Sequence, residues 1–187
     1  MIDLPITETH LRTTLTTYLD EHPEEKPGLA PVLDLLDSGV DLTVRSEFRG
    51  HATAGAILAG PDGRILHVHH LALDKWLLPG GHLESTDDAL LEAALRELTE
   101  ETGIPAGAVS TVAHRPVHID VHSIPANDAK GEPEHQHIDF RCLFRTTADV
   151  GQLQAEEVTG AAWRDADTIG DQVLRQRVTQ TLQPRQA

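Results

Sequence analysis

Three glutamates at helical spacing are the residues of this sequence with the clearest chemical meaning. Glu97, Glu100 and Glu101 stand at positions i, i+3 and i+4, and residues with this spacing share one face of an α-helix. Like charges so placed repel one another in a bare helix, whereas a hard divalent cation makes the arrangement favourable. Oxygen-only ligands suit Mg²⁺ or Mn²⁺ best. The spacing therefore predicts a divalent-metal site, and the alternative is an acidic helix face that is simply solvated.

The helix that must carry these glutamates is predicted from the apolar residues around them. Such residues recur at i, i+3, i+4 and i+7, which is typical of a helix that faces a core. They are Leu91, Ala94, Leu95 and Leu98. Because Ser85, Thr86 and Asp87 offer N-cap oxygens and Gly103 suits the position after the last turn, we predict a helix over residues 87–102.

The run over residues 80–104 resembles the signature of the Nudix hydrolase family. That signature is a glycine, five residues, a glutamate, seven residues and then Arg-Glu-aliphatic-x-Glu-Glu-x-Gly-aliphatic. Its second half is present as Arg-Glu-Leu-Thr-Glu-Glu-Thr-Gly-Ile over residues 96–104. The preceding Trp-Leu-Leu-Pro-Gly-Gly, residues 76–81, is similar to the strand-to-loop segment of the family. We call residues 81–104 the box; the resemblance covers about 25 of 187 residues.

The box departs from the family pattern at one place. Between Gly81 and Arg96 this chain has one residue more, and an aspartate, Asp87 or Asp88, stands where glutamate is usual. An extra residue inside the helix would rotate everything beyond it by about 100°, whereas one in the loop only lengthens the loop. We therefore expect a longer loop, with Asp88 at the equivalent position.

The resemblance implies hydrolysis of a diphosphate linked to another group, with a metal-activated water attacking phosphorus. The metal ligands that it implies are Glu97, Glu100, Glu101 and the carbonyl of Gly81. The general base is expected to be Glu97, or else a glutamate of a later loop, Glu156 or Glu157. Arg96 is expected to orient Glu97 through a bidentate contact. A nucleoside di- or triphosphate derivative is the expected substrate, because that is the broadest substrate class of the family.

Polar and apolar residues alternate in two segments after the predicted helix. The polar members are His118, Asp120 and His122 in the first and His135, His137, Asp139 and Arg141 in the second. Period two places each polar set on one face of a strand, and residues 125–134 have the length of a hairpin loop, so the two faces are expected side by side. The predicted substrate pocket is lined by His118, Asp120, His137, Asp139 and Arg141. A solvated sheet face and a second, transition-metal site are the alternatives.

Three further side chains carry weaker predictions. We expect Arg141 to grip phosphate through its planar guanidinium. His82 lies beside Gly81 in the predicted loop, and Arg49 precedes the first predicted strand. Both are candidate substrate contacts, with loop packing and a plain strand start as the alternatives.

The remaining pattern indicates an α/β (α+β) fold with a mixed sheet covered by helices on both faces. We predict two helices within residues 7–39, strands over 51–59, 64–70, 109–115, 117–124 and 135–146, a segment around Trp163, and a helix over 171–182. The Nudix fold is such a sandwich. Residues 1–45 are expected to be an N-terminal helical extension and residues 46–187 a Nudix hydrolase domain. The extension should pack either on the main domain or on a second copy of the chain. The second arrangement would make the protein a homodimer.

Composition argues against several other functions. The formal net charge of −15 with only three lysines opposes binding of duplex nucleic acid. No apolar run approaches the length of a membrane span, and the first residues lack the features of a signal peptide. Cys142, the single cysteine, lies between Phe140 and Phe144 and is expected to be a core thiol. The cytoplasm is the expected compartment.

Two other functions share part of this pattern. One is a non-catalytic Nudix-like sensor of a phosphorylated metabolite, which would typically have lost box carboxylates. The other is an enzyme like isopentenyl diphosphate isomerase, whose histidine ligands would have to converge near the box. The sequence does not specify which group is attached to the diphosphate.

Overall fold

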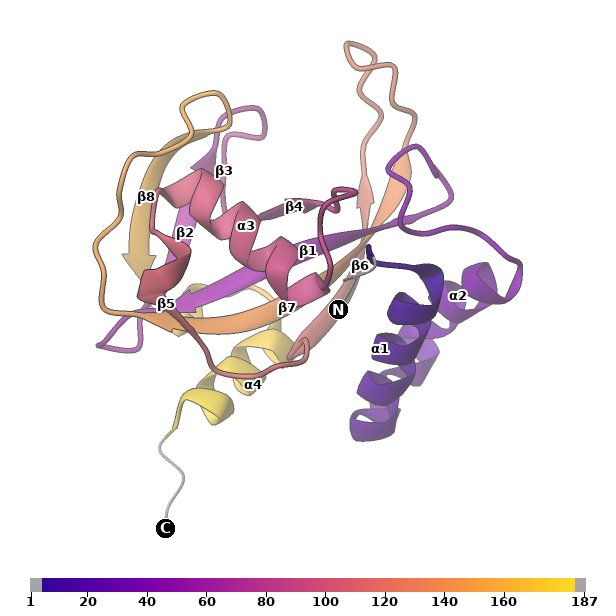
Figure 1. The fold of residues 1–187 in the computed structure, drawn as a ribbon, viewed down its shortest axis with the longest axis horizontal. Helices are drawn as coiled ribbons and strands as arrows, with labels where there is room; N and C mark the ends of the chain where they lie inside the picture. Colours follow the sequence, from indigo (N-terminus) through magenta and orange to yellow (C-terminus); the bar gives the residue numbers. More distant parts are fainter. Residues whose placement is uncertain (1–4, 184–187) are drawn as a thin grey trace.

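The computed structural model describes residues 5–183, which form one mixed sheet with helices on both faces (Figure 1). The helices are α1 (Glu8–Glu21), α2 (Lys26–Asp37), α3 (Leu90–Thr102) and α4 (Gln172–Leu182). The strands are β1 (His51–Ala59), β2 (Ile65–His70), β3 (Lys75–Leu77), β4 (Gly80–His82), β5 (Val109–Thr111), β6 (His118–Ile124), β7 (His135–Thr146) and β8 (Val158–Arg164). The predicted α/β (α+β) class is confirmed. Among residues 5–183, none of the helices has both the length and the apolar character that a membrane span requires.

The sheet is organised around the two long strands β1 and β7. Its main path runs β3-β2-β1-β7-β5, while β4 pairs with β1, β6 with β7 and β8 with β2. β1 and β7 run parallel, and the other pairs are antiparallel. Parallel neighbours this far apart in sequence require a long crossover connection, which here includes α3.

Alternation along β1 and β7 sends side chains to two separate cores. Ala56 and Leu58 belong to a large core with Leu98 of α3, whereas Ile57 and Leu143 belong to a smaller core with Val178 of α4. Successive strand residues point to opposite faces, so α3 and α4 must cover opposite sides of the sheet. Cys142 is buried in the large core, and burial raises the pKa of its thiol to about 12.

The helix α3 follows the predicted amphipathic pattern but begins later than predicted. Ala93, Ala94 and Leu98 are buried against the sheet, and Gly103 ends the helix in the left-handed conformation with φ of 66°. The predicted start at residue 87 is wrong. The helix begins at Leu90, because the side chain of Asp87 is bonded elsewhere instead of capping it.

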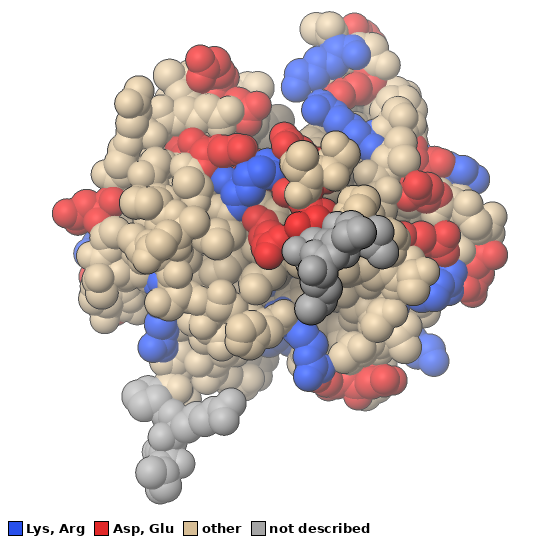
Figure 2. All heavy atoms as spheres, in the orientation of Figure 1, with Lys and Arg blue, Asp and Glu red and all other residues tan. Residues whose placement is uncertain are grey.

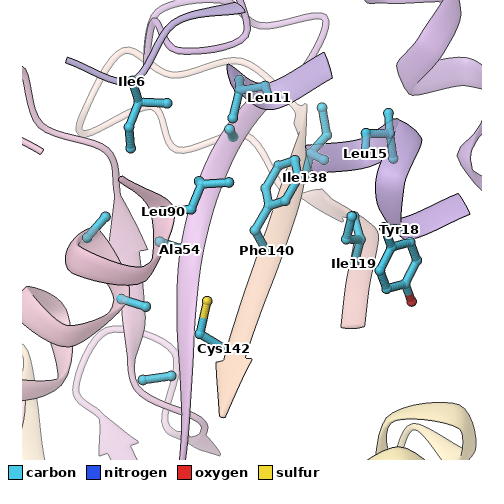
Figure 3. Packing of buried hydrophobic residues seen from close by; sticks show 14 of the residues in the cluster. Ile6, Leu11, Leu15, Tyr18, Ala54, Leu90, Ile119, Ile138, Phe140 and Cys142 are labelled. Carbon is cyan, nitrogen blue, oxygen red and sulfur yellow. The ribbon is translucent and has the colours of Figure 1, made fainter. Parts of the chain in front are cut away.

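The N-terminal helices α1 and α2 pack onto the same core as α3. The side chain of Thr7 accepts from the backbone N–H of His10 and so caps α1. Figure 3 shows Leu11 and Leu15 of α1 beside Ile138 and Phe140 of β7. These residues are all nearly inaccessible to solvent, so within this chain the helical pair covers apolar sheet surface.

The strands β1 and β7 have their predicted bounds, and β2, β6 and α4 differ from theirs by one residue at the start. The predicted strand over 109–115 is shorter, because β5 ends at Thr111. The double glycine, predicted as part of a loop, instead belongs to the short strand β4, which pairs with β1. This pairing fixes the start of the box against the centre of the sheet.

Candidate functional site

The first part of the site is the close approach of β4 to α3. Gly81 lies opposite Ala54 of β1, and a Cβ added to it would come within 2.6 Å of the carboxylate atoms of Glu97. A Cβ added to Gly80 would lie 2.7 Å from the carbonyl oxygen of Ala54. The contact at Gly80 is with backbone, so no side chain fits there. A side chain at Gly81 would instead displace the carboxylate of Glu97, so the glycine allows Glu97 to lie against the backbone of β4.

The guanidinium of Arg96 joins the loop before α3 to the helix. Its Nε and Nη2 donate to the two carboxylate oxygens of Asp87, each over 2.9 Å. Its Nη1 donates to Glu97 over 2.9 Å and to Glu100 over 3.2 Å, and Nη2 also donates to the carbonyl of His82 over 2.9 Å. The hydrogen bonds to Asp87 are the main reason that the Arg96 pKa is raised. The predicted contact between Arg96 and Glu97 is present, and the bidentate partner is Asp87.

The structure corrects the predicted role of Asp88. Asp87 is buried, with 5% of its side chain exposed, and it also accepts from the backbone N–H of Glu84 over 2.8 Å. Asp88 is exposed. Asp87, and not Asp88, is therefore the aspartate that binds Arg96, while the predicted lengthening of the loop stays a prediction.

Two of the three helical glutamates are held out of water. Glu101 is only 3% exposed and accepts from the backbone N–H of Gly80 over 3.3 Å. Burial, and then the charge of Glu97, raise the Glu101 pKa to about 8. Burial also raises the pKa of Glu97, against the opposing effect of Arg96. The charge of Glu157, in the loop before β8, raises both pKa values further.

This donor set fits a hard divalent cation. Figure 2 shows acidic side chains gathered beside a basic one near the middle of the face that carries α3. Glu97, Glu100, Glu101 and the carbonyl of Gly81 supply only oxygen. Burial, and then the neighbouring carboxylates, raise the pKa values of Glu97 and Glu101, and a bound cation would favour the charged carboxylates again. In the part of the chain that the structure describes, the carboxylates of the three glutamates do not all lie within 4.8 Å of one another. Arg96 lies between Glu97 and Glu100, and Glu101 turns toward Gly80.

The buried Glu101 gives a pH prediction for protein kept in EDTA. A carboxyl whose pKa is raised by folding favours the folded state while it is protonated. Its contribution is present at low pH and is lost as the pH rises from the unfolded value of about 4.3 toward about 8. We expect Glu101→Gln to gain stability relative to the unsubstituted chain over this range, measured by chemical denaturation at a series of pH values. A difference that does not change with pH would contradict the assignment, and Glu92→Gln, exposed on the same helix, is the control.

The predicted alignment of two polar strand faces is confirmed. In the pairing of β6 with β7, Asp120 lies opposite Asp139 and His122 lies opposite His137. Arg141 donates to Asp139 over 2.8 Å and to Asp120 over 3.3 Å, and its pKa is raised chiefly by these two carboxylates. Arg141 therefore bridges carboxylates of both strands, and its contact with phosphate stays a prediction.

The other predicted substrate contacts lie in different surroundings. His118 is buried, with its Nε2 3.5 Å from a carboxylate oxygen of Asp171 at the start of α4. Arg49 makes its side-chain hydrogen bonds with Glu47 and not with the box carboxylates. His82 lies on β4, where its ring is 5.1 Å from that of His137, centroid to centroid.

Sequence reasoning did not predict that His51 would join the histidines of β7. The parallel pairing of β1 with β7 puts His51 opposite His137, and the His51 ring lies 5.1 Å from that of His135. A histidine at the start of β1 and two at the start of β7 were visible in the sequence. The pairing of β1 with β7 could not be predicted, because no local pattern specifies which distant strands are neighbours.

Comparisons with known proteins agree with this geometry. The family model described as "NUDIX domain" matches residues 49–182. The chain is 30% identical over 135 residues to a probable DHNTP pyrophosphohydrolase of Lactococcus lactis subsp. cremoris, covering 70% of this chain and 75% of that protein. It is 34% identical over 160 residues to the m7GpppN-mRNA hydrolase NUDT17 of Danio rerio, covering 79% of this chain and 53% of the relative, so it spans about half the length of that protein.

Solved structures show the same fold. A NUDIX-family hydrolase from Clostridium perfringens superposes with a TM-score of 0.52 at 21% identity, covering 70% of this chain and 95% of the other. The segment that the family model matches, residues 49–182, includes the whole sheet, the glycines of β4 and the glutamates of α3. This chain belongs to the Nudix hydrolase family.

Proposed function

We propose that this chain is a divalent-metal-dependent pyrophosphohydrolase, acting on a diphosphate that is linked to a nucleoside or a similar group. The observation that carries the proposal is the packing of Gly81 against Glu97, with Glu101 buried behind them and Arg96 holding the loop. Relatives named as a probable DHNTP pyrophosphohydrolase and as an m7GpppN-mRNA hydrolase support the reaction class.

The reaction breaks one phosphoanhydride bond. Oxygen of a water molecule forms a new bond to phosphorus, the bridging P–O bond breaks, and the departing phosphate group keeps the bridging oxygen. Mg²⁺ or Mn²⁺, when held by Glu97, Glu100, Glu101 and the Gly81 carbonyl, would neutralise phosphate oxygens and make the attacking water more acidic. The negative charge of the protein as a whole, −15, makes such neutralisation necessary for an anionic substrate to bind.

Glu97 is the proposed acceptor of the proton that the water loses. Its carboxylate lies against the backbone of β4, and burial raises its pKa toward the range where a general base works well. Arg96 orients it by donating to one of its oxygens over 2.9 Å. The alternative base is Glu157 in preference to Glu156. The charge of Glu157 raises the pKa values of both Glu97 and Glu101.

The polar face of β6 and β7 is the proposed site for the rest of the substrate. It contains His118, Asp120, His137, Asp139 and Arg141. Thr53 of β1, which pairs with His82 of β4, donates to Asp139 over 3.2 Å. Because these polar residues of β7 alternate with those of the large core, they lie on the side of the sheet that α4 covers. We propose that residues 1–45, of which the structure describes 5–45, form a helical extension that packs on this Nudix domain.

A substrate panel tests the proposed function. Nucleoside triphosphates, sugar diphosphates, dihydroneopterin triphosphate and a capped RNA are incubated with Mg²⁺ or Mn²⁺, and release of phosphate, pyrophosphate or monophosphate is measured. We expect metal-dependent turnover that Glu100→Gln lowers by at least about 10²-fold, the scale of losing one essential electrostatic interaction. Binding without turnover would indicate a sensor, and isomerisation of isopentenyl diphosphate would indicate the isomerase class. Equal activity of Glu100→Gln and the unsubstituted chain would reject the metal site.

A further inference from the structure

Several histidines meet where β1, β4 and β7 lie side by side (Figure 1). The cluster consists of His51 on β1, His82 on β4, and His135 and His137 on β7. One ligand atom from each of His51, His135 and His137 lies within 4.8 Å of the others. Among the histidine, cysteine, aspartate and glutamate side chains of residues 5–183, these three histidines are the ones that lie close enough together to hold a metal ion.

The outer hydrogen bonds of two rings fix which nitrogen faces the cluster. Nδ1 of His51 lies 3.1 Å from the carbonyl oxygen of Glu47, and Nδ1 of His135 lies 2.7 Å from that of Pro133. A carbonyl oxygen can only accept, so each Nδ1 carries the proton and each Nε2 of the neutral ring keeps a lone pair. Donation of the outer N–H to a backbone carbonyl is the usual arrangement around metal-bound histidine.

Within residues 5–183, one inner nitrogen of the cluster lacks a hydrogen-bond partner, and the other two, Nε2 of His135 and Nε2 of His137, pair only with each other. Nε2 of His51 is buried and has no hydrogen-bond partner among the residues that the structure describes. Burying a polar atom without a partner is unfavourable. Its lone pair points into a cluster whose other members are also imidazoles, so a cation is the species that would satisfy all of them together.

The spacing of one pair of nitrogens matches tetrahedral coordination. Nε2 of His135 and Nε2 of His137 are 3.3 Å apart. Two nitrogens bound to one zinc ion at 2.0–2.1 Å with a tetrahedral angle between them are separated by about 3.3–3.4 Å. The two rings are therefore already at the separation that a shared zinc ion requires.

We propose that His51, His135 and His137 bind Zn²⁺, or a similar first-row transition-metal ion, through their ring nitrogens. The fourth position faces His82, whose ring is 5.2 Å from that of His51 and 5.1 Å from that of His137. Imidazole selects zinc, copper or nickel, whereas the all-oxygen box selects magnesium or manganese. The chain thus has two metal sites of different chemistry, and the histidine site does not depend on the proposed hydrolase function. A bound ion would join the first residues of β1 and β7.

Cobalt binding tests the histidine site without any assay of activity. Tag-free protein treated with EDTA is titrated with Co²⁺, and the visible absorption of tetrahedral cobalt is followed. Zn²⁺ is then added to displace the cobalt. We expect one Co²⁺ per chain, displaced by one Zn²⁺. A wild-type protein that gives no visible band and takes up no Zn²⁺ would overturn the proposal, whatever the variants do.

Variants locate the ion. His135→Gln and His137→Gln should each weaken Zn²⁺ binding by more than about 100-fold, because loss of a direct ligand exceeds the 10–100-fold cost of losing an outer partner. Glu100→Gln and the exposed His114→Gln should retain one tightly bound Zn²⁺. Thermal unfolding in EDTA checks that each variant is folded. Unchanged affinity in both histidine variants, or loss in Glu100→Gln, would overturn the assignment.

Discussion

Glu97→Gln is expected to lower kcat/KM by about 10³-fold. The substitution keeps the size of the side chain and its place against Gly81, but it removes the charge that binds the cation and accepts the proton. Loss of one electrostatic contact in an active site costs about 10²–10³-fold, and Glu97 serves two such roles, so the upper end applies. The measurement is steady-state hydrolysis of the best substrate from the panel at saturating Mg²⁺.

Matched variants show whether that loss is specific. Glu92→Gln changes an exposed glutamate on the same helix and should leave kcat/KM within about twofold.

Glu157→Gln separates the two candidate bases. If Glu97 is the base, Glu157→Gln should keep activity within about tenfold, whereas a greater loss than in Glu97→Gln would move the base to Glu157. Activity of Glu97→Gln within tenfold of the unsubstituted chain would contradict both roles.

Asp87→Ala is expected to destabilise the protein by about 3 kcal/mol, because it leaves a largely buried guanidinium without its bidentate partner. Asp87 accepts two hydrogen bonds from Arg96 and one from the backbone of Glu84. Its side chain is 5% exposed and that of Arg96 is 19% exposed, so solvent screens the pair little. Chemical denaturation at neutral pH measures the change.

The neighbouring aspartate provides the control. Asp88 is exposed, and Asp88→Ala should change stability by less than about 0.5 kcal/mol. In the double variant with Arg96→Ala, the cost of Asp87→Ala should fall, because the two side chains act as one unit. Equal effects of the two aspartate substitutions, or additive effects in the double variant, would contradict the pairing.

The sequence was sufficient for the elements whose signals are local. β1 and β7 follow from runs of apolar residues interrupted by period-two polar positions, and α3 follows from its leucine and alanine stripe. Gly103 marks the end of α3 because it adopts a left-handed conformation. The glutamates of the box could be placed on one helical face from their spacing alone.

The start of the box could not be predicted with the same precision. The choice between Asp87 and Asp88 depended on how the loop runs, and loop paths follow from tertiary contacts instead of periodicity. Arg96 selects Asp87 through contacts that also include the carbonyl of His82. The strand β4 is only three residues long and begins with two glycines, so nothing in its composition indicates a strand.

The histidine cluster shows the second limit. His51 and His137 are neighbours because β1 and β7 pair in parallel, across most of the domain in sequence. Alternation predicted which face of β7 carries His135 and His137, but it could not predict that β1 lies beside them. Arg141 differs, because its partners Asp120 and Asp139 lie on its own strand and on the strand that the hairpin loop joins to it, and that pairing could be predicted.

We infer that the glutamates of α3 and the carbonyl of Gly81 in β4 bind the cation that hydrolysis requires. Crystals soaked in Mn²⁺ and measured for anomalous scattering would show this ion. We expect a peak beside Glu97 and Glu101 at the carbonyl of Gly81. A map with no peak there, from protein that still hydrolyses its substrate in the same Mn²⁺ buffer, would contradict it.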